Sequence, residues 1–368
     1  MRSSRPRPSA ATVKIADVAR MAGVSVATVS RALANPDVVT QETRQRVMAA
    51  VAQSGYTPNA SARNLRIRRT MMALVVVPDI ANPFFAEILR GIDARLSQHG
   101  YGLIIANLDN SPAKETRYVD LAYSGQVDGI LLLCGRVPGL PGRDMAGAGL
   151  PLVAACEQIH GARFPQVEIN NRAAARQAVA HLAGLGHRRI AYLSGPGANI
   201  LDQQRRQGYA DALADAGIAP DPALMFAGDF TFRAGAAAAR RILDLPLADR
   251  PTALFAANDE MAIGFLKAAH AAGCRVPDDF SVVGFDAIEY ADYCEPTLTT
   301  VSQPRYQIGE QAAGLLVKAM ISRDMTSQDV TSSDMLSSGM PGDCHVLGAE
   351  LLVRASTARP AGARPLEG

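Results

Sequence analysis

The sequence predicts an α/β protein with a small N-terminal helix-turn-helix headpiece and a core of parallel, doubly wound sheets in two lobes. Closely spaced amphipathic helices and most of the positive charge lie before residue 70. From residue 71 onward, short apolar runs alternate with amphipathic segments, a pattern typical of parallel sheets with helices on both faces. About ten strand candidates are many for one such sheet, so we expect two lobes.

Before the headpiece, residues 1–12 are rich in Arg, Ser and Pro and predict a disordered arm. The headpiece itself is predicted at 13–57 and begins with a short helix. From Ile15 to Ala22, apolar side chains recur at i, i+3, i+4 and i+7, which gives one apolar stripe. Gly23 then supplies a tight turn.

A second helix is expected directly after this turn. Ser25 is placed to cap it through its hydroxyl, and Val29 and Leu33 share its buried side. The second helix of such a pair lies in the DNA major groove, where its early residues touch base edges. The candidate DNA-contacting residues of this helix are Ser25, Val26, Ala27, Thr28, Ser30 and Arg31.

Charge favours this interpretation over an ordinary helical hairpin. Residues 1–69 contain twelve Lys and Arg against three Asp and Glu, a net of +9, whereas the whole chain is only +2. The positive potential is therefore concentrated beside the candidate reading helix, as phosphate attraction requires.

A third helix and a linker complete the N-terminal part. Thr40 is placed to cap the helix, Val47, Ala50 and Val51 form its apolar face, and Gly55 marks its end. Residues 58–70 then form an exposed basic connection between the domains.

Composition excludes several other classes of protein. The five cysteines are scattered and lack metal-ligand spacing, so neither a disulfide framework nor a zinc site is indicated. No apolar run reaches membrane-spanning length, and no signal-type apolar core follows the basic N-terminus. We expect a cytoplasmic protein with no membrane association, no metal and no cofactor.

The phrases DVARMAGVSVATVSRAL and YTPNASARNL resemble the lac repressor family of bacterial transcription regulators. The segments NPFFAEILRGI, AANDEMAIG, SVVGFD and LTTVSQPRYQIG continue the resemblance, which spans residues 13 to about 357. It implies a periplasmic-binding-protein-like core at 71–357 whose chain crosses between lobes near residues 170, 302 and 330. The implied lobes are 71–169 with 303–330, and 170–302 with 331–357, followed by a tail at 358–368.

In this family the linker folds into a hinge helix on DNA, and a leucine wedges into the minor groove. Leu65 occupies that position here. Such a wedge kinks the duplex and exchanges unstacking cost for extra contact. The resemblance thus adds Asn59, Ala62 and Leu65 to the candidate DNA-contacting residues.

Ligands of open α/β sheets bind outside the carboxyl ends of the strands. Candidate effector-binding residues follow three predicted strands there, and the resemblance adds Arg205, Gln303 and the less usual Glu157. For each residue the alternative is a core aromatic, a helix cap or a surface ion pair. The family often has Asp-Asn where this chain has Asn170 and Asn171, so one charge is missing. The strand-end candidates are Asn82, Phe84, Phe85, Asn258, Phe285 and Asp286.

Two other classes of protein fit the sequence less well. An enzyme receives little support, because SGPGANI is not G-x-G-x-x-G and no P-loop, G-x-S-x-G or H-E-x-x-H occurs. A transporter's solute-binding protein would need a signal sequence and would not use a basic headpiece. Residues 324–344 lack apolar periodicity and predict a long loop of unassigned role.

The sequence therefore predicts a homodimeric repressor that binds a near-palindromic double-stranded DNA operator. Its core is expected to sense a small polyhydroxylated effector. A nucleoside is the first choice, and a pentose or hexose is the alternative. Lobe rearrangement would shift the hinge segments and change operator affinity.

Overall fold

The computed structural model describes residues 13–56, 69–109, 111–327 and 343–360. Two compact units divide at Thr70 and Met71, so the headpiece and the core are described separately. The predicted hinge contacts Asn59, Ala62 and Leu65 lie outside the described residues.

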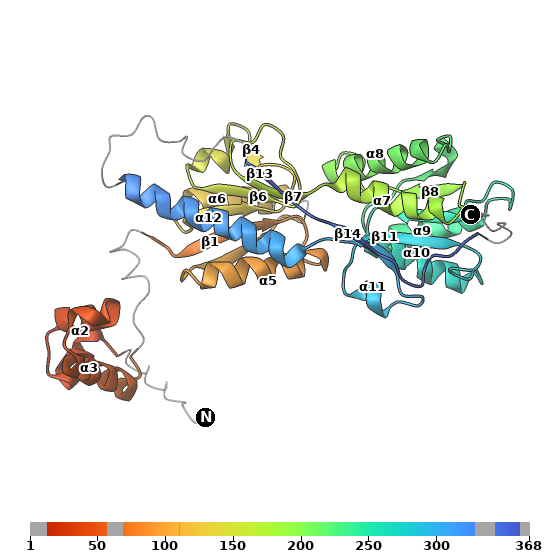
Figure 1. The fold of residues 1–368 in the computed structure, drawn as a ribbon. Coiled ribbons are helices and arrows are strands. Elements are labelled where there is room, and N and C mark those ends of the chain that lie inside the picture. Colours follow the sequence, from red (N-terminus) through yellow and green to blue (C-terminus); the bar gives the residue numbers. More distant parts are fainter. Residues whose placement is uncertain (1–12, 57–68, 110, 328–342, 361–368) are drawn as a thin grey trace, which may run out of the picture. The chain divides into compact units, whose positions relative to one another are not determined.

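The headpiece is a set of short helices joined by tight turns (Figure 1). Gly23 has a φ of 63°, a left-handed conformation that glycine adopts without strain, and it ends the first helix. Ser25 Oγ accepts a hydrogen bond from Thr28 N at 3.1 Å and so caps the second helix. The elements are α1 (Ile15–Ala22), α2 (Val26–Ala34), the 3-10 turn η1 (Pro36–Val38) and α3 (Gln41–Ser54).

One apolar cluster holds the headpiece together. Its members come from the faces that the helical spacing predicts, although Leu33 is only partly buried and Ala32 is more deeply placed. Arg46 of α3 adds a polar tie, because its Nη2 donates to Ala22 O at 2.6 Å at the end of α1. The buried members are Val18, Ala19, Ala22, Val29, Ala32, Val47 and Ala50.

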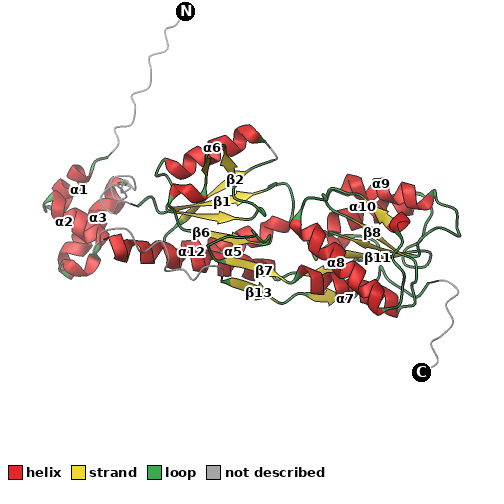
Figure 2. Ribbon diagram, turned by 90° about the horizontal axis from the view of Figure 1, so that it is seen from above, coloured by secondary structure: helices red, strands yellow, loops and turns green. Residues whose placement is uncertain are grey.

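The first lobe of the core is a six-stranded, fully parallel sheet in the order β13-β7-β6-β3-β1-β2. Successive residues of β1 (Met72–Val77) face opposite sides of the sheet: Val75 packs in the cluster that contains helices α5 and α12, whereas Leu74 packs with α6. Helices therefore cover both faces (Figure 2). The elements are β1 (Met72–Val77), α5 (Phe84–Ser97), β2 (Gly102–Asn107), α6 (Pro112–Tyr123), β3 (Gly129–Leu132), β4 (Gly139–Leu140), β5 (Arg143–Asp144), η2 (Ala146–Ala148), β6 (Leu152–Ala155), β7 (Gln166–Ile169), α12 (Arg305–Ser327) and β13 (Cys344–Leu347).

The second lobe is another six-stranded sheet, in the order β14-β12-β11-β10-β8-β9. All its pairs are parallel except the edge pair of β12 and β14. The two parallel lobes confirm the predicted fold class. The elements are α7 (Asn171–Gly184), β8 (Ile190–Leu193), α8 (Ile200–Asp215), η3 (Pro222–Leu224), β9 (Met225–Phe226), α9 (Phe232–Leu243), β10 (Ala253–Ala256), α10 (Asp259–Ala271), β11 (Ser281–Asp286), α11 (Tyr290–Tyr293), β12 (Thr299–Ser302) and β14 (Glu350–Leu352).

The chain passes between the two sheets three times, after Ile169, after Ser302 and between Leu347 and Glu350. The third crossing differs from the expected one near residue 330. The reason is that β13 pairs with β7 and completes the edge of the first sheet, so Cys344–Leu347 belongs to the first lobe. The predicted loop at 324–344 is also shorter at its start, because α12 continues to Ser327.

Two helix pairs pack backbone against backbone through a glycine on each helix. A Cβ added at Gly91 of α5 would overlap Tyr306 O of α12, and one at Gly309 of α12 would overlap Ile88 O. In the second lobe, a Cβ added at Gly235 of α9 would overlap Met261 O of α10, and one at Gly264 of α10 would overlap Phe232 O of α9. Glycine is required at these four positions for the helices to approach this closely.

Candidate DNA-reading helix and effector site

The outward face of α2 is the candidate DNA-reading surface of the headpiece. Val26 is 44% exposed, and Ser25, Ala27 and Arg31 are exposed as well. Thr28 and Ser30 are half-buried. The early residues of α2 therefore lie on a free surface while Val29 fills the core, which is the arrangement that a major-groove reading helix needs.

Arg31 contributes the charged group of this face. Its Nε donates to Ala27 O one turn earlier at 3.4 Å. Because a guanidinium carries five N–H donors, this single bond leaves the fork available for a base edge or a phosphate.

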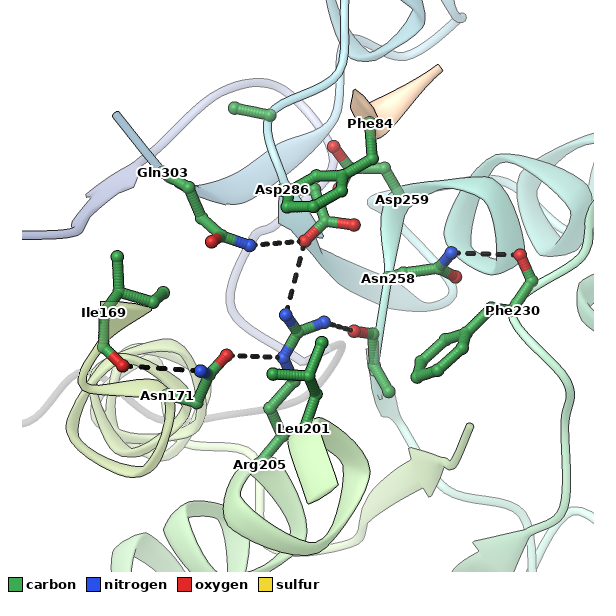
Figure 3. Close-up of polar contacts among 12 residues, drawn as sticks. Phe84, Ile169, Asn171, Leu201, Arg205, Phe230, Asn258, Asp259, Asp286 and Gln303 are labelled. Atoms are coloured by element: carbon green, nitrogen blue, oxygen red, sulfur yellow. Dashed lines mark hydrogen bonds and ion pairs between the residues drawn. The ribbon is translucent and has the colours of Figure 1, made fainter. Parts of the chain in front are cut away.

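In the core, the carboxyl ends of the second lobe's strands gather around the buried guanidinium of Arg205 (Figure 3). Arg205 lies on α8 and is 2% exposed. Its Nε donates to Asn171 Oδ1 at 3.0 Å, and its Nη1 donates to Ala257 O. Its Nη2 lies 3.5 Å from Asp286 Oδ1. We call Arg205, Asn171, Phe285, Asp286 and Gln303 the Arg205 cluster.

Asp286 is the charged partner in the Arg205 cluster. Gln303 Nε2 donates to its Oδ1 at 2.7 Å, and the residue is 5% exposed. Burial raises the pKa of Asp286 to about 6, although Arg205, Arg305 and Gln303 favour the carboxylate. Its φ of 114° is strained for a residue with a side chain, so the surrounding contacts must hold it in place.

Phe285 lies at the end of β11, and its role in effector binding stays a prediction. Its ring is fully buried, and the ring centroid lies 3.7 Å from the Arg205 Cζ atom. The ring therefore supports the guanidinium through a cation–π contact.

Asn258 lies at the end of β10, as predicted, and connects two elements. Its Oδ1 caps α10 by accepting from Met261 N at 3.0 Å, and its Nδ2 donates to Phe230 O at 3.0 Å. Phe230 has a φ of 67°, and its ring lies over Gly195, where an added Cβ would overlap it. Figure 3 places Phe230 beside the Arg205 cluster. Sequence reasoning did not single out Phe230 or Leu201, which is near Arg205 in the same view.

Three candidates come from the first lobe's loop and helix after β1. Asn82 Oδ1 accepts from Phe84 N at 2.8 Å, so its side chain fixes the start of α5. Phe84 and Phe85 are both 6% exposed and meet edge to face at 5.2 Å between ring centroids. Of these residues, Figure 3 draws Phe84 near Asp286.

Glu157 follows β6 and accepts hydrogen bonds from residues of both lobes. Its Oε2 accepts from Gly135 N at 3.0 Å and from Asn199 Nδ2 at 3.2 Å. Burial raises the pKa of this carboxyl, and Arg205 acts in the opposite direction. Asn199 also caps α8 through Leu201 N, so the helix that carries Arg205 is tied to the first lobe through Glu157.

A hollow of about 660 Å³ lies beside the crossings rather than around the Arg205 cluster. It shares only Gln303 with the cluster, and its lining is residues 302–307, 348–350 and Glu87. Within the described residues, no group of His, Cys, Asp and Glu has the arrangement of a metal site. None of the helices in the described ranges is long and apolar enough to span a membrane.

A basic headpiece with an exposed reading helix, joined to a two-lobed α/β core with a buried polar strand-end cluster, defines a DNA-binding regulator with a ligand-sensing core. Residues 14–59 match the model of bacterial regulatory proteins of the lacI family, and residues 179–357 match the periplasmic binding protein-like domain. The chain belongs to the lacI family of bacterial transcription regulators. It is a regulator and not an enzyme.

The HTH-type transcriptional repressor CytR of Escherichia coli is 43% identical over 317 residues, which cover 86% of this chain and 92% of that protein. The solved lac repressor dimer bound to operator and the anti-inducer ONPF is similar at 25% identity and a TM-score of 0.77, covering 94% of this chain and 99% of that one. A CelR–cellobiose complex matches at 34% identity and a TM-score of 0.68, covering 94% and 99%.

Proposed function

We propose that this regulator is a cytoplasmic homodimeric repressor whose two headpieces bind a near-palindromic operator and whose core binds a nucleoside. The dimer and the operator are supported by the similarity to the lac repressor dimer bound to operator. A two-fold symmetric protein matches a two-fold symmetric DNA site. Effector binding would change the lobe arrangement and so the operator affinity.

The Arg205 cluster is the main support for the position of the effector site. Arg205 and Asp286 offer a donor fork and a carboxylate acceptor within one buried group, which suits vicinal hydroxyls of a sugar ring. Phe84 and Phe230 add aromatic rings beside it, and such rings stack on a flat base. The hollow at the crossings offers no comparable buried pair, so we assign the effector to the cluster. A pentose or hexose remains the alternative, since a similar lacI-family regulator from Enterococcus faecium was solved with bound ribose, a pentose.

Gel shifts on operator DNA combined with thermal-shift screening test this proposal. Nucleosides should raise the melting temperature of the full chain, since a ligand that binds only the folded state stabilises it. The same nucleosides should change the gel-shift midpoint. A response to free pentoses or hexoses, with none to nucleosides, would favour the alternative. If no DNA fragment gives a retarded complex, operator binding is contradicted.

Arg31→Ala should weaken operator binding by roughly 1 to 3 kcal/mol, provided that Arg31 makes a bidentate base contact. The headpiece fold should survive, because the side chain is exposed. Binding curves at one fixed salt concentration check this. Arg20→Ala, which removes an exposed arginine from α1, is a matched control for charge. Equal losses in both variants would reduce Arg31 to a general electrostatic role.

Leu65→Ala tests the hinge proposal, which concerns a residue outside the described ranges. Operator affinity and DNA bending should fall together, because only the minor-groove wedge is removed. Dimerisation and effector binding should be unchanged. A circular-permutation gel measures the bend, and an unaltered bend would show that Leu65 is not the wedge.

A further inference from the structure

The turn that begins at the end of β11 has a backbone conformation that few residues with side chains adopt. Asp286 has a φ of 114° and Ala287 has a φ of 50°, so two successive residues with a Cβ lie in the region that glycine favours. Such a conformation persists only where its surroundings hold it. We call residues 286–288 the strained turn. Because this turn begins with Asp286, its shape decides where the carboxylate of the Arg205 cluster points.

Thr300 and Asp259 hold the strained turn from within the second lobe. The Thr300 hydroxyl accepts a hydrogen bond from Ala287 N at 3.3 Å and donates one to Asp259 Oδ1 at 2.6 Å. The other carboxyl oxygen of Asp259, Oδ2, accepts from Ile288 N at 2.9 Å. Thr300 and Asp259 are both fully buried. Gly284 leaves the space for this carboxyl group, because a Cβ added there would overlap Asp259 Oδ1.

Arg305 holds the same turn from the first lobe. It is the first residue of α12, which packs on the sheet of that lobe, and its Nη2 donates to Ala287 O at 2.6 Å. The N–H of Ala287 is therefore bonded inside the second lobe, and its carbonyl is bonded by a helix of the first lobe. A change in the arrangement of the lobes would act on Ala287 and so on the neighbouring Asp286.

We infer that Thr300, Asp259 and Arg305 are positioning residues for effector binding. Thr300 and Asp259 offer no surface to a ligand, because they are fully buried, and they act on the effector only through the strained turn. Together the three side chains set the direction in which the Asp286 carboxylate faces the rest of the Arg205 cluster. This inference rests on the proposed effector site and adds how that site keeps its shape and where lobe movement reaches it.

Thr300→Val tests the inference, because valine has nearly the same volume as threonine and lacks only the hydroxyl group. Titration calorimetry on the full chain uses cytidine, adenosine and ribose as probes. A probe that binds wild type should bind Thr300→Val at least about tenfold more weakly, because the carboxylate that it contacts is no longer held in place. Thr300→Ser keeps the hydroxyl group and should stay within about threefold of wild type.

Thr299→Val is the matched control for the loss of a buried hydroxyl. Thr299 is the preceding residue of β12 and is also fully buried, but its hydroxyl accepts from Arg354 N at 2.9 Å and not from the strained turn. Both valine variants should lower the urea midpoint, whereas only Thr300→Val should lower the affinity for the probe. Operator binding without a probe should persist in both variants.

A second measurement needs no ligand. The coupling free energy between Arg205 and Asp286, obtained by urea unfolding of the single and double variants Arg205→Met and Asp286→Asn, reports how well the two groups are aligned. This coupling should fall by at least about half when Thr300→Val is also present, and it should stay unchanged when Thr299→Val is present.

Arg305→Met takes the place of Thr300→Val if that variant does not fold, because the Arg305 side chain is only half-buried. It should lower both the probe affinity and the coupling, since it removes the donor to Ala287 O. Arg354→Met is its control, because Arg354 Nη1 also donates to a main-chain carbonyl, that of Leu298, which lies outside the strained turn.

The outcomes separate this inference from the proposed function. If no probe binds wild type, the proposed effector class fails, and the coupling measurement alone decides the positioning role. If a probe binds and Thr300→Val keeps the wild-type affinity, the effector proposal stands and the positioning role is overturned. An equal loss of affinity in Thr299→Val, or an unchanged coupling in Thr300→Val, overturns it as well.

Discussion

The Asp286→Asn variant is expected to have lost its response to effector, and its stability should no longer depend on pH between about 4 and 6. Burial raises the pKa of Asp286 to about 6, so the folded chain holds this proton more tightly than the unfolded chain does. Wild-type stability should therefore fall as the pH rises from about 4 to about 6, with a full cost on the order of 3 kcal/mol at pH 7. Asparagine does not titrate, so this pH dependence should disappear, while Arg205 loses its counter-charge.

The same substitution should lower the affinity for the effector, because a carboxylate accepts hydrogen bonds from hydroxyl groups more strongly than an amide does. Urea unfolding at pH 5 and pH 7.5, nucleoside calorimetry and gel shifts on the full chain check the three properties. Wild-type stability should fall between pH 5 and pH 7.5, the stability of the variant should change less, and operator binding should persist. A variant that binds the nucleoside with wild-type affinity would place Asp286 outside the effector site. Loss of operator and effector binding together would make it a structural residue.

Replacing Arg205 by Met should destabilise the core by about 3 to 5 kcal/mol at neutral pH, as expected when one partner of a buried ion pair is removed. Asp286 would lose its counter-charge, and Asn171 Oδ1 and Ala257 O would lose their donor. The loss should be smaller at pH 5, where Asp286 takes up a proton.

The double variant Arg205→Met with Asp286→Asn provides the control for this result. It should recover part of the stability, because no unpaired charge is left, while effector affinity stays low. Urea midpoints of the wild type and the three variants complete the cycle. Additive losses in that cycle would show that the two side chains do not interact in the folded protein.

The sequence was sufficient for those parts of the fold that local chemistry decides. The cap at Ser25, the turn at Gly23 and the apolar spacing of α1 act within a few residues, so the headpiece could be predicted closely. The third crossing could not, because the sheet that β13 joins depends on pairing with a strand far away in the chain. The residue pattern of such a short strand is compatible with the edge of either sheet, so it does not predict which sheet the strand joins.

The candidate site was predicted where strand ends define it and missed where backbone conformation does. Arg205, Asp286 and Gln303 come together as expected. The Phe285 ring contacts the same Arg205 guanidinium, a packing contact that the residue pattern does not specify. Phe230 owes its place to a positive φ and to a bond from Asn258, and neither is visible in a residue pattern.

The paired glycines of α5 with α12 and of α9 with α10 restrict how this protein can change over generations. Every single-base change that alters a glycine codon to another residue adds at least a Cβ, and at Gly91, Gly309, Gly235 and Gly264 that atom would overlap the partner helix's backbone. A compensating side-chain change cannot create the space, because the obstacle is main chain. In a library that samples all substitutions in the core, these four positions should retain glycine, while the solvent-facing positions of the same helices drift freely.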